Sequence, residues 1–348
     1  MKQSTRNILL QAVSGLMIIT LLIWQGKRPR LVELDSGYYQ TMGTLARMLV
    51  VAPDKATAEQ AVKAAVAVFD RIETLMSDYD PDSQISEVNR RAFAEPVAVD
   101  ADVFDVLVAA VEYSRLSDGA FDITVGPVVQ LWRTARNTAV APTPEQIADA
   151  GAKVGWRHLI LDPEHKTVRF ALEGMALDLG GIAKGYAIDK AAEAIRQAGA
   201  VGGMVDIGGD LVCFGRSLGQ NPHWLIGLQD PAADEKHLMR LALDDRAVAT
   251  SGDYRRFTIL NGQKYSHIVN PVTADAAADL SSVTIIAPTA MQADALATAV
   301  SVLGPEKGMA LIETIDDVEA ILIRSNTPNE YLTTSGAFRY IHNTPVTH

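Results

Sequence analysis

Apolar side chains recur at helical spacing in four stretches of the chain, and this pattern predicts four helices. They span residues 57–76, 102–116, 182–197 and 289–303. Two of them open with a capping box, in which a threonine is followed three residues later by a glutamine: Thr57 with Gln60, and Thr289 with Gln292. We therefore expect these two helices to begin at their threonines.

Shorter apolar runs, bounded by turn-forming residues, predict strands. They span residues 159–161, 167–171, 175–179, 204–214, 224–229, 247–251, 256–260 and 282–287. The strands outnumber the helices, and many follow one another directly along the chain. This order favours an α+β fold of mostly antiparallel sheets with packed helices over a doubly wound sheet.

The most apolar stretch lies near the N-terminus, where residues 8–24 contain no charged side chain and basic residues lie on both sides. Its length is at the short end for a spanning helix. A cleaved signal peptide is the alternative, but no small-residue cleavage site follows Trp24. We expect an N-terminal transmembrane helix, with residues 1–36 as anchor and linker and residues 37–348 as one compact domain. The basic residues at both ends leave its orientation open.

Charge and cysteine content narrow the function further. The 348 residues carry a formal net charge of −11, which argues against binding nucleic acid through its phosphates. An anionic small substrate stays possible, because a bound metal ion can invert the local field. The single cysteine, Cys213, excludes an intramolecular disulfide, and its strand-like surroundings predict a buried, inert thiol.

A glycine turn is the first candidate for chemistry. A predicted strand ends at Asp178, and Gly180 and Gly181 then turn the chain into a helix. Free backbone N–H groups at a helix start suit an anionic group, and Lys184 adds a positive charge. The sequence therefore predicts a phosphate-binding turn, with an ordinary strand-to-helix connection as the alternative.

A second candidate is a pair of oxygen ligands on one helix. Asp294 and Thr298 are four residues apart, so they share a helix face. Alanines surround them, and we expect a neighbouring backbone to come close and Asp294 to be buried. Such ligands suit Mg²⁺ or Ca²⁺. A solvated aspartate that binds nothing is the alternative.

Three further side chains are candidates with structural alternatives. His267 lies near a turn and could act as a general base or contact phosphate, although a single histidine is more often structural. Tyr79 and Phe121 lie just beyond predicted helices. Either ring could stack on a flat ligand or belong to the core.

Seven short motifs occur in an order that resembles the FAD:protein FMN transferase (ApbE) family. They are Thr41-Met-Gly-Thr44, residues 77–89, Gly119-Ala-Phe-Asp122, Asp178-Leu-Gly-Gly-Ile-Ala-Lys-Gly-Tyr186, Asp206-Ile-Gly-Gly-Asp210, His267-Ile268 with Pro271, and Thr284 followed by Asp294-Ala-Leu-Ala-Thr298. The resemblance extends over residues 38–340 and implies that FAD binds between two lobes of the α+β fold.

The resemblance also implies roles for individual residues. The positions that match flavin-nucleotide contacts are Met42, Tyr79, Ala120, Phe121, Asp122, Asp178, Lys184, His267 and Ile268. The positions that match Mg²⁺ ligands are Asp294, Thr298 and the carbonyl oxygen of Gly181. His267 matches a histidine implicated in catalysis.

The activity that the resemblance implies is Mg²⁺-dependent transfer of FMN from FAD to a Thr or Ser hydroxyl. The acceptor would be a flavoprotein such as a membrane electron-transport subunit, the new bond a phosphodiester, and the released product AMP. An FAD pyrophosphatase that yields FMN and AMP is one alternative, and a non-catalytic flavin-binding protein is another. The resemblance further implies a place at the bacterial inner membrane, with the catalytic domain in the periplasm.

Two departures from the family pattern stand out. The lipoprotein cysteine of many members is missing, so tethering would depend on residues 8–24. Asn270 and Ala274 stand where the family usually has aspartate and glycine. Asn270 removes a charge near His267, which puts a carboxylate–histidine pair there in doubt, though not the metal site.

Overall fold

A computed structural model describes residues 30–342, except 220, 232, 234, 235, 253–256, 261, 262, 267, 276, 278, 328 and 329, and describes only the backbone of 257–260 and 263–266. Its centre is an eight-stranded sheet in the order β1-β2-β6-β7-β10-β13-β14-β15, with neighbouring strands antiparallel. The strands are β1 Val32–Thr41, β2 Thr44–Ala52, β6 Gly202–Ile207, β7 Asp210–Gly215, β10 Arg246–Gly252, β13 Leu280–Ala287, β14 Glu319–Arg324 and β15 Tyr331–Thr333.

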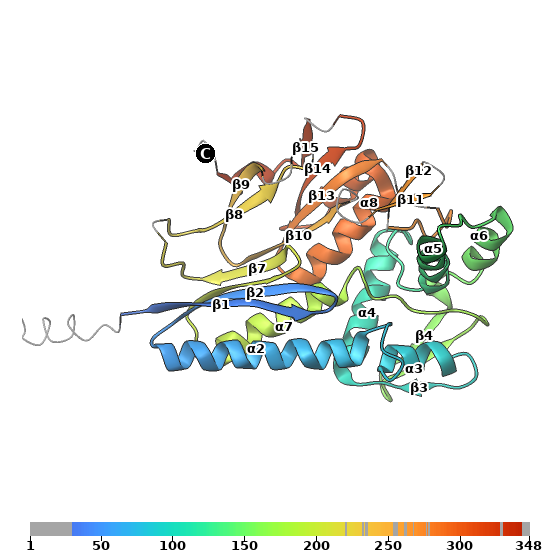
Figure 1. Ribbon diagram of the computed structural model, residues 1–348, viewed down its shortest axis with the longest axis horizontal. Coiled ribbons are helices and arrows are strands. Elements are labelled where there is room, and N and C mark those ends of the chain that lie inside the picture. Colours follow the sequence, from blue (N-terminus) through green and yellow to red (C-terminus); the bar gives the residue numbers. More distant parts are fainter. Residues whose placement is uncertain are drawn as a thin grey trace, which may run out of the picture.

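Both faces of this sheet are covered, because strand side chains point alternately to opposite faces. Three helices pack on one face: α2 Lys55–Met76, α7 Ala183–Gln197 and α8 Ala290–Ile312. A three-stranded sheet covers the other face: β8 Trp224–Gln229, β9 His237–Leu243 and β16 Ile341–His342. Within β13, for example, Ile285 packs toward α8 while Ile286 packs toward β8 and β9. Figure 1 shows α2 and α7 below the sheet and β8 and β9 above it.

The remaining elements gather beside one end of the large sheet (Figure 1). The helices are α3 Gln84–Arg91, α4 Ala101–Leu116, α5 Gly126–Thr138 and α6 Pro144–Gly151, and the strands are β3 Val97–Ala98, β4 Leu159–Asp162, β5 Thr167–Phe170, β11 Phe257–Leu260 and β12 Gln263–Ser266. Short 3₁₀ helices span Trp156–His158 and Ala337–Arg339. Phe104 and Phe170 belong to the same apolar core as Met48 and Phe69 of the large sheet and α2. The predicted α+β fold with antiparallel sheets is confirmed.

The four predicted helices are present as α2, α4, α7 and α8, but the start of α2 differs from the prediction. Asp54 is its N-cap and accepts a hydrogen bond from the Thr57 backbone N–H at 2.8 Å, so the helix begins before the expected threonine. At α8 the predicted N-cap is confirmed, because the Thr289 hydroxyl accepts from Gln292 N–H at 3.2 Å.

The strand predictions need two corrections. Residues 204–214 form two strands, β6 and β7, joined by a tight turn at Gly208 and Gly209, both with positive φ. Residues 175–179 form only one isolated bridge, from Ala176 to Val125. The Asn89 side chain takes both backbone hydrogen bonds of Leu177, which a strand partner would otherwise take.

Helix α8 is the one helix in the described part of the chain that is long and apolar enough to cross a membrane. Most of its apolar residues are buried against β10, β13 and β14, so core packing accounts for its hydropathy. Gly304 has φ 77° and breaks the helical conformation where the predicted helix ends. The transmembrane helix predicted at residues 8–24 lies outside the described residues.

Cys213 lies on β7 and is fully buried between the large sheet and the β8–β9 layer. Burial raises the pKa of its thiol, because the thiolate loses its hydration there. The predicted buried, inert thiol is therefore confirmed.

Candidate active site

A cavity of about 910 Å³ lies among the first turn of α7, helix α8, the β1–β2 turn, helix α5 and the edge of the β8–β9 layer. This volume is within the range of small-molecule sites. Every predicted site residue in the described part of the chain lies on its wall: Met42, Tyr79, Ala120, Phe121, Asp122, Asp178, Gly181, Lys184, Ile268, Asp294 and Thr298. His267 lies outside the described residues, so its catalytic role stays a prediction.

The two predicted metal ligands of α8 meet the glycine turn. Asp294 is 4% exposed, which confirms its predicted burial. Gly181 approaches Thr298 so closely that an added Cβ would lie 2.7 Å from the Thr298 Oγ1. At Gly185 an added Cβ would lie 2.3 Å from the Ala290 carbonyl oxygen, so α7 and α8 cross backbone against backbone. The expected close approach at the alanine-rich face is therefore present.

The backbone N–H groups around the glycine turn are less available than the sequence suggests. Gly180 N–H donates to Asp178 Oδ1 at 2.9 Å, and Ala183 N–H donates to the Leu179 carbonyl at 2.9 Å. Gly185 N–H donates to Asp294 Oδ2 at 3.1 Å. The predicted anion site thus depends more on the Lys184 ammonium than on free N–H groups.

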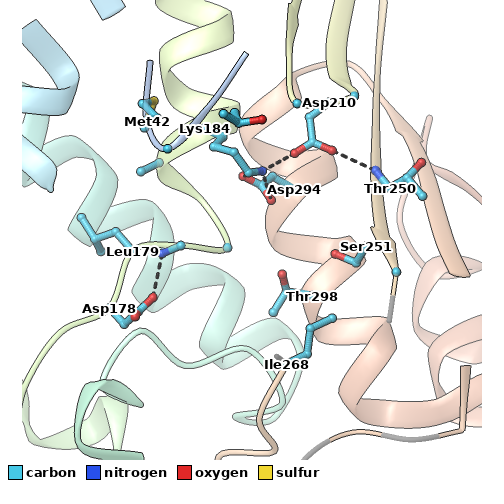
Figure 2. Close-up of a pocket in the computed structure, with 18 of the residues that line it drawn as sticks. Met42, Asp178, Leu179, Lys184, Asp210, Thr250, Ser251, Ile268, Asp294 and Thr298 are labelled. Atoms are coloured by element: carbon cyan, nitrogen blue, oxygen red, sulfur yellow. Dashed lines mark hydrogen bonds and ion pairs between the residues drawn. The ribbon is translucent and has the colours of Figure 1, made fainter. Parts of the chain in front are cut away.

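Three side chains from three elements form what we name the lysine cluster: Lys184 of α7, Asp210 of β7 and Asp294 of α8 (Figure 2). The Lys184 ammonium contacts Asp210 Oδ2 and lies 3.3 Å from Asp294 Oδ1. Burial opposes the charge on Lys184, but the two carboxylates outweigh it and raise its pKa. Burial also raises the pKa of Asp294, and Lys184 opposes this shift.

A second group of charges, which we name the arginine cluster, lies elsewhere on the cavity wall and consists of Arg133, Asp78 and Asp178. Arg133 of α5 donates to Asp78 Oδ2 at 2.8 Å and lies 3.6 Å from Asp178 Oδ2. Its guanidinium carbon lies 4.2 Å from the centre of the Tyr79 ring. Burial raises the pKa of Asp178, and the neighbouring Asp78 adds to the shift.

The aromatic candidates differ in their surroundings. Tyr79 is 74% exposed, which excludes the core interpretation and leaves ring surface open to a ligand beside the Arg133 contact. Phe121 is buried, and its ring meets Tyr113 edge to face with centroids 6.3 Å apart. Phe121 is therefore both a core residue and part of the cavity wall.

Asp122 uses its carboxylate to hold its own loop. Its Oδ1 accepts from the Thr124 N–H at 2.8 Å and from the Thr124 hydroxyl at 2.7 Å, while Oδ2 accepts from Trp156 N–H at 2.8 Å. Burial raises the pKa of this carboxyl. The geometry assigns Asp122 a loop-shaping contact, and its predicted contact with a flavin nucleotide stays a prediction.

Several polar residues of the wall are absent from the sequence prediction: Arg133, Asp210, Thr250 and Ser251. The sequence could have identified Asp210 as a site residue, because it is the last residue of the Asp206-Ile-Gly-Gly-Asp210 motif. No motif marks Arg133, Thr250 or Ser251, because they reach the cavity only through the packing of α5 and β10 against distant elements.

Comparison with known proteins gives a consistent result. The chain matches the ApbE family over residues 42–322. It is 32% identical to an FAD:protein FMN transferase of Haemophilus influenzae over 343 residues, 95% of this chain and 98% of the relative. An FAD:protein FMN transferase of Treponema pallidum is 33% identical over 297 residues, 81% of this chain and 82% of the relative.

Two solved structures are similar along almost their whole length. The ApbE protein of Thermotoga maritima has a TM-score of 0.80 at 30% identity and covers 90% of this chain and 100% of its own. The flavin transferase ApbE of Vibrio cholerae has a TM-score of 0.78 at 30% identity, with 89% and 99% covered.

Proposed function

The chain belongs to the ApbE family, and we propose that it transfers the FMN half of FAD to a threonine or serine hydroxyl of another protein. One observation carries the proposal: a single cavity joins an exposed aromatic ring beside the arginine cluster to an enclosed, charged corner at the lysine cluster. FAD has the matching parts, a flat ring system and a diphosphate. The relatives of this protein are named for the same transfer.

We propose that Asp294, Thr298 and the Gly181 carbonyl oxygen hold Mg²⁺. The residues fit this ion because all three offer oxygen ligands, and Thr298 Oγ1 makes no hydrogen bond within the described part of the chain. These three oxygens would leave positions for water and substrate phosphate, which Mg²⁺ often keeps in its shell. When bound, it neutralises charge on the diphosphate and the leaving group.

The protein's own part in the reaction is to position and to neutralise. Lys184 holds the diphosphate through its ammonium, and Tyr79 offers a ring face for the flavin. The acceptor oxygen forms a bond to the FMN-side phosphorus while the bond from that phosphorus to the bridging oxygen breaks, so AMP leaves. His267 is the candidate to take the hydroxyl proton, on sequence grounds alone.

The direct test is mass spectrometry of an acceptor peptide incubated with the enzyme, FAD and Mg²⁺. We expect a mass gain of one FMN on a Thr or Ser and one AMP released for each FMN attached. Free FMN and AMP without a modified peptide would support the pyrophosphatase alternative. FAD that binds but stays intact would support the non-catalytic alternative.

We also propose that residues 8–24 anchor the enzyme in the bacterial inner membrane, with residues 30–348 in the periplasm and membrane electron-transport flavoproteins as acceptors. The uncharged run and its basic flanks support an anchor. Cell fractionation tests it: removal of residues 1–30, which leaves strand β1 from Val32 intact, should release an active enzyme from the membrane. Full membrane retention after this deletion contradicts the anchor.

A further inference from the structure

The two carboxylates that flank Lys184 look equivalent in sequence, but their hydrogen bonds differ. Asp210 has both oxygens engaged: Oδ2 contacts the Lys184 ammonium, and Oδ1 accepts from Thr250 N–H at 3.0 Å (Figure 2). Asp294 also has both oxygens engaged, but more loosely: Oδ2 accepts from Gly185 N–H at 3.1 Å, and Oδ1 and Oδ2 lie 3.3 and 3.4 Å from the Lys184 ammonium. The closer ion pair of Lys184 is therefore the one with Asp210.

Asp210 is also the more firmly fixed of the two. It starts β7, is 5% exposed, and is tied to the neighbouring strand β10 through Thr250. The Thr250 hydroxyl is in turn 3.0 Å from the Thr284 hydroxyl of β13. Three strands of the central sheet thus hold the carboxylate that holds the lysine.

We propose that Asp210 is a positioning residue that keeps the Lys184 ammonium from fully neutralising Asp294, so that Asp294 stays available to a divalent cation. This inference rests on the proposed function. At neutral pH the lysine cluster carries two negative charges and one positive charge, a net −1. Without the Asp210 charge the sum is zero, and Lys184 turns to Asp294 as its one remaining carboxylate in the cluster.

The same charge sum gives a series of variants with different expected cation affinities. Asp210→Asn leaves a net charge of zero, Lys184→Met leaves −2, and the double variant returns to −1. We expect Mg²⁺ affinity to fall by at least about tenfold in Asp210→Asn, because one unit charge is lost in a partly enclosed site. We expect the double variant to lie within about threefold of wild type, and Lys184→Met to bind more tightly than wild type.

The measurement is isothermal titration of the full chain with Mg²⁺ alone, without FAD, so that it does not depend on turnover. Far-UV circular dichroism and thermal unfolding check that each variant folds. Asp206→Asn is the matched control: it changes an aspartate of the same hairpin that lies off the cavity wall, and Mg²⁺ affinity should stay within about twofold.

Wild-type Mg²⁺ affinity in Asp210→Asn overturns the inference, and so does a double variant that binds as weakly as Asp210→Asn. If Asp210→Asn does not fold, Lys184→Met alone decides, because unchanged or weaker binding contradicts the charge argument. Asp294→Ala separates the two proposals. Persistent Mg²⁺ binding in that variant contradicts the metal site itself, whereas its loss with an unaffected Asp210→Asn contradicts only the role of Asp210.

Discussion

The lysine cluster and the arginine cluster follow one plan, a cation between two carboxylates, but they differ in enclosure. In the lysine cluster the carboxylate side chains are 7% and 5% exposed. In the arginine cluster they are 22% and 16% exposed, and the guanidinium stacks on a ring that is open to solvent. Water screens the second group more than the first, so an equal change of charge should have unequal effects.

This contrast suggests a division of labour within one cavity. The enclosed cluster suits charged chemistry, because electrostatic interactions are strongest where water is excluded. The open cluster suits recognition of a planar group, since Arg133 is held by two acids and keeps the Tyr79 ring in place. The following variants test that division, from the largest expected effect to the smallest.

The same substitution in both clusters gives the sharpest comparison. We expect Asp294→Asn to lower the rate of FMN transfer by at least about a hundredfold, because it removes the buried charge that would hold the cation. Asp78→Asn should lower it by no more than about threefold, because its charge is partly screened. Steady-state transfer rates at saturating FAD measure both. Equal losses of transfer rate in the two variants would contradict the claim that the two clusters have different roles.

The second largest effect on FMN transfer is expected from a substitution in the glycine turn. Gly181→Ala places a methyl carbon only 2.7 Å from Thr298 Oγ1, so the turn or the helix must shift. We expect the Mg²⁺ concentration for half-maximal transfer to rise by about tenfold or more, because ligand geometry is lost. Gly219→Ala, in an exposed loop with more room, is the control and should change it little. Similar values in both variants would show that the close approach is not needed.

The open end of the cavity should affect FAD rather than the cation. We expect Tyr79→Ala to raise KM for FAD by about three- to tenfold, since an aromatic stacking contact contributes roughly 0.5–1.5 kcal/mol. Mg²⁺ binding in the absence of FAD should not change. Tyr79→Phe should behave as wild type, and Tyr38→Ala, a similarly exposed tyrosine off the cavity wall, serves as control. A lower kcat at unchanged KM would contradict the stacking role.

The smallest effect concerns the crossing of α7 and α8 that supports the lysine cluster. Asp189 of α7 accepts from the Ala290 and Met291 N–H groups of α8 at 2.8 and 2.9 Å. Burial raises the pKa of Asp189 from 3.8 to about 6, so the folded state binds this proton more tightly than the unfolded state. Its contribution to the unfolding free energy therefore falls as pH rises from 3.8 to about 6, and is level above that.

Asp189→Asn removes this titration, so the wild type should lose more unfolding free energy than the variant between pH 4 and pH 6.5. At pH 7 the variant should be less stable by about 1 kcal/mol, because the amide nitrogen cannot accept the second hydrogen bond. Denaturant unfolding at both pH values measures this, with Asp105→Asn on the exposed face of α4 as control. An equal change of unfolding free energy with pH in the wild type and Asp189→Asn would contradict the titration of Asp189.

Local sequence patterns were enough to predict the main helices and several residues of the candidate site. The periodicity of apolar residues identified four helices, and the i, i+4 spacing placed Asp294 and Thr298 on one face of α8. Motif order identified part of the cavity wall, including Asp178 and Lys184, but missed Arg133, Thr250 and Ser251. These features depend on neighbours within a few residues, so they can be predicted from sequence alone.

The tertiary structure decided how the two acids share Lys184. Asp210 and Asp294 are separated by many residues, and only the packing of β7, β10, α7 and α8 shows that the Lys184 ammonium contacts Asp210 closely and lies farther, at 3.3 Å, from Asp294 Oδ1. The same holds for Leu177, where a side chain from α3 replaced the expected strand partner. Hydrogen bonds and charge pairs between distant segments depend on three-dimensional distance, which a one-dimensional pattern does not contain.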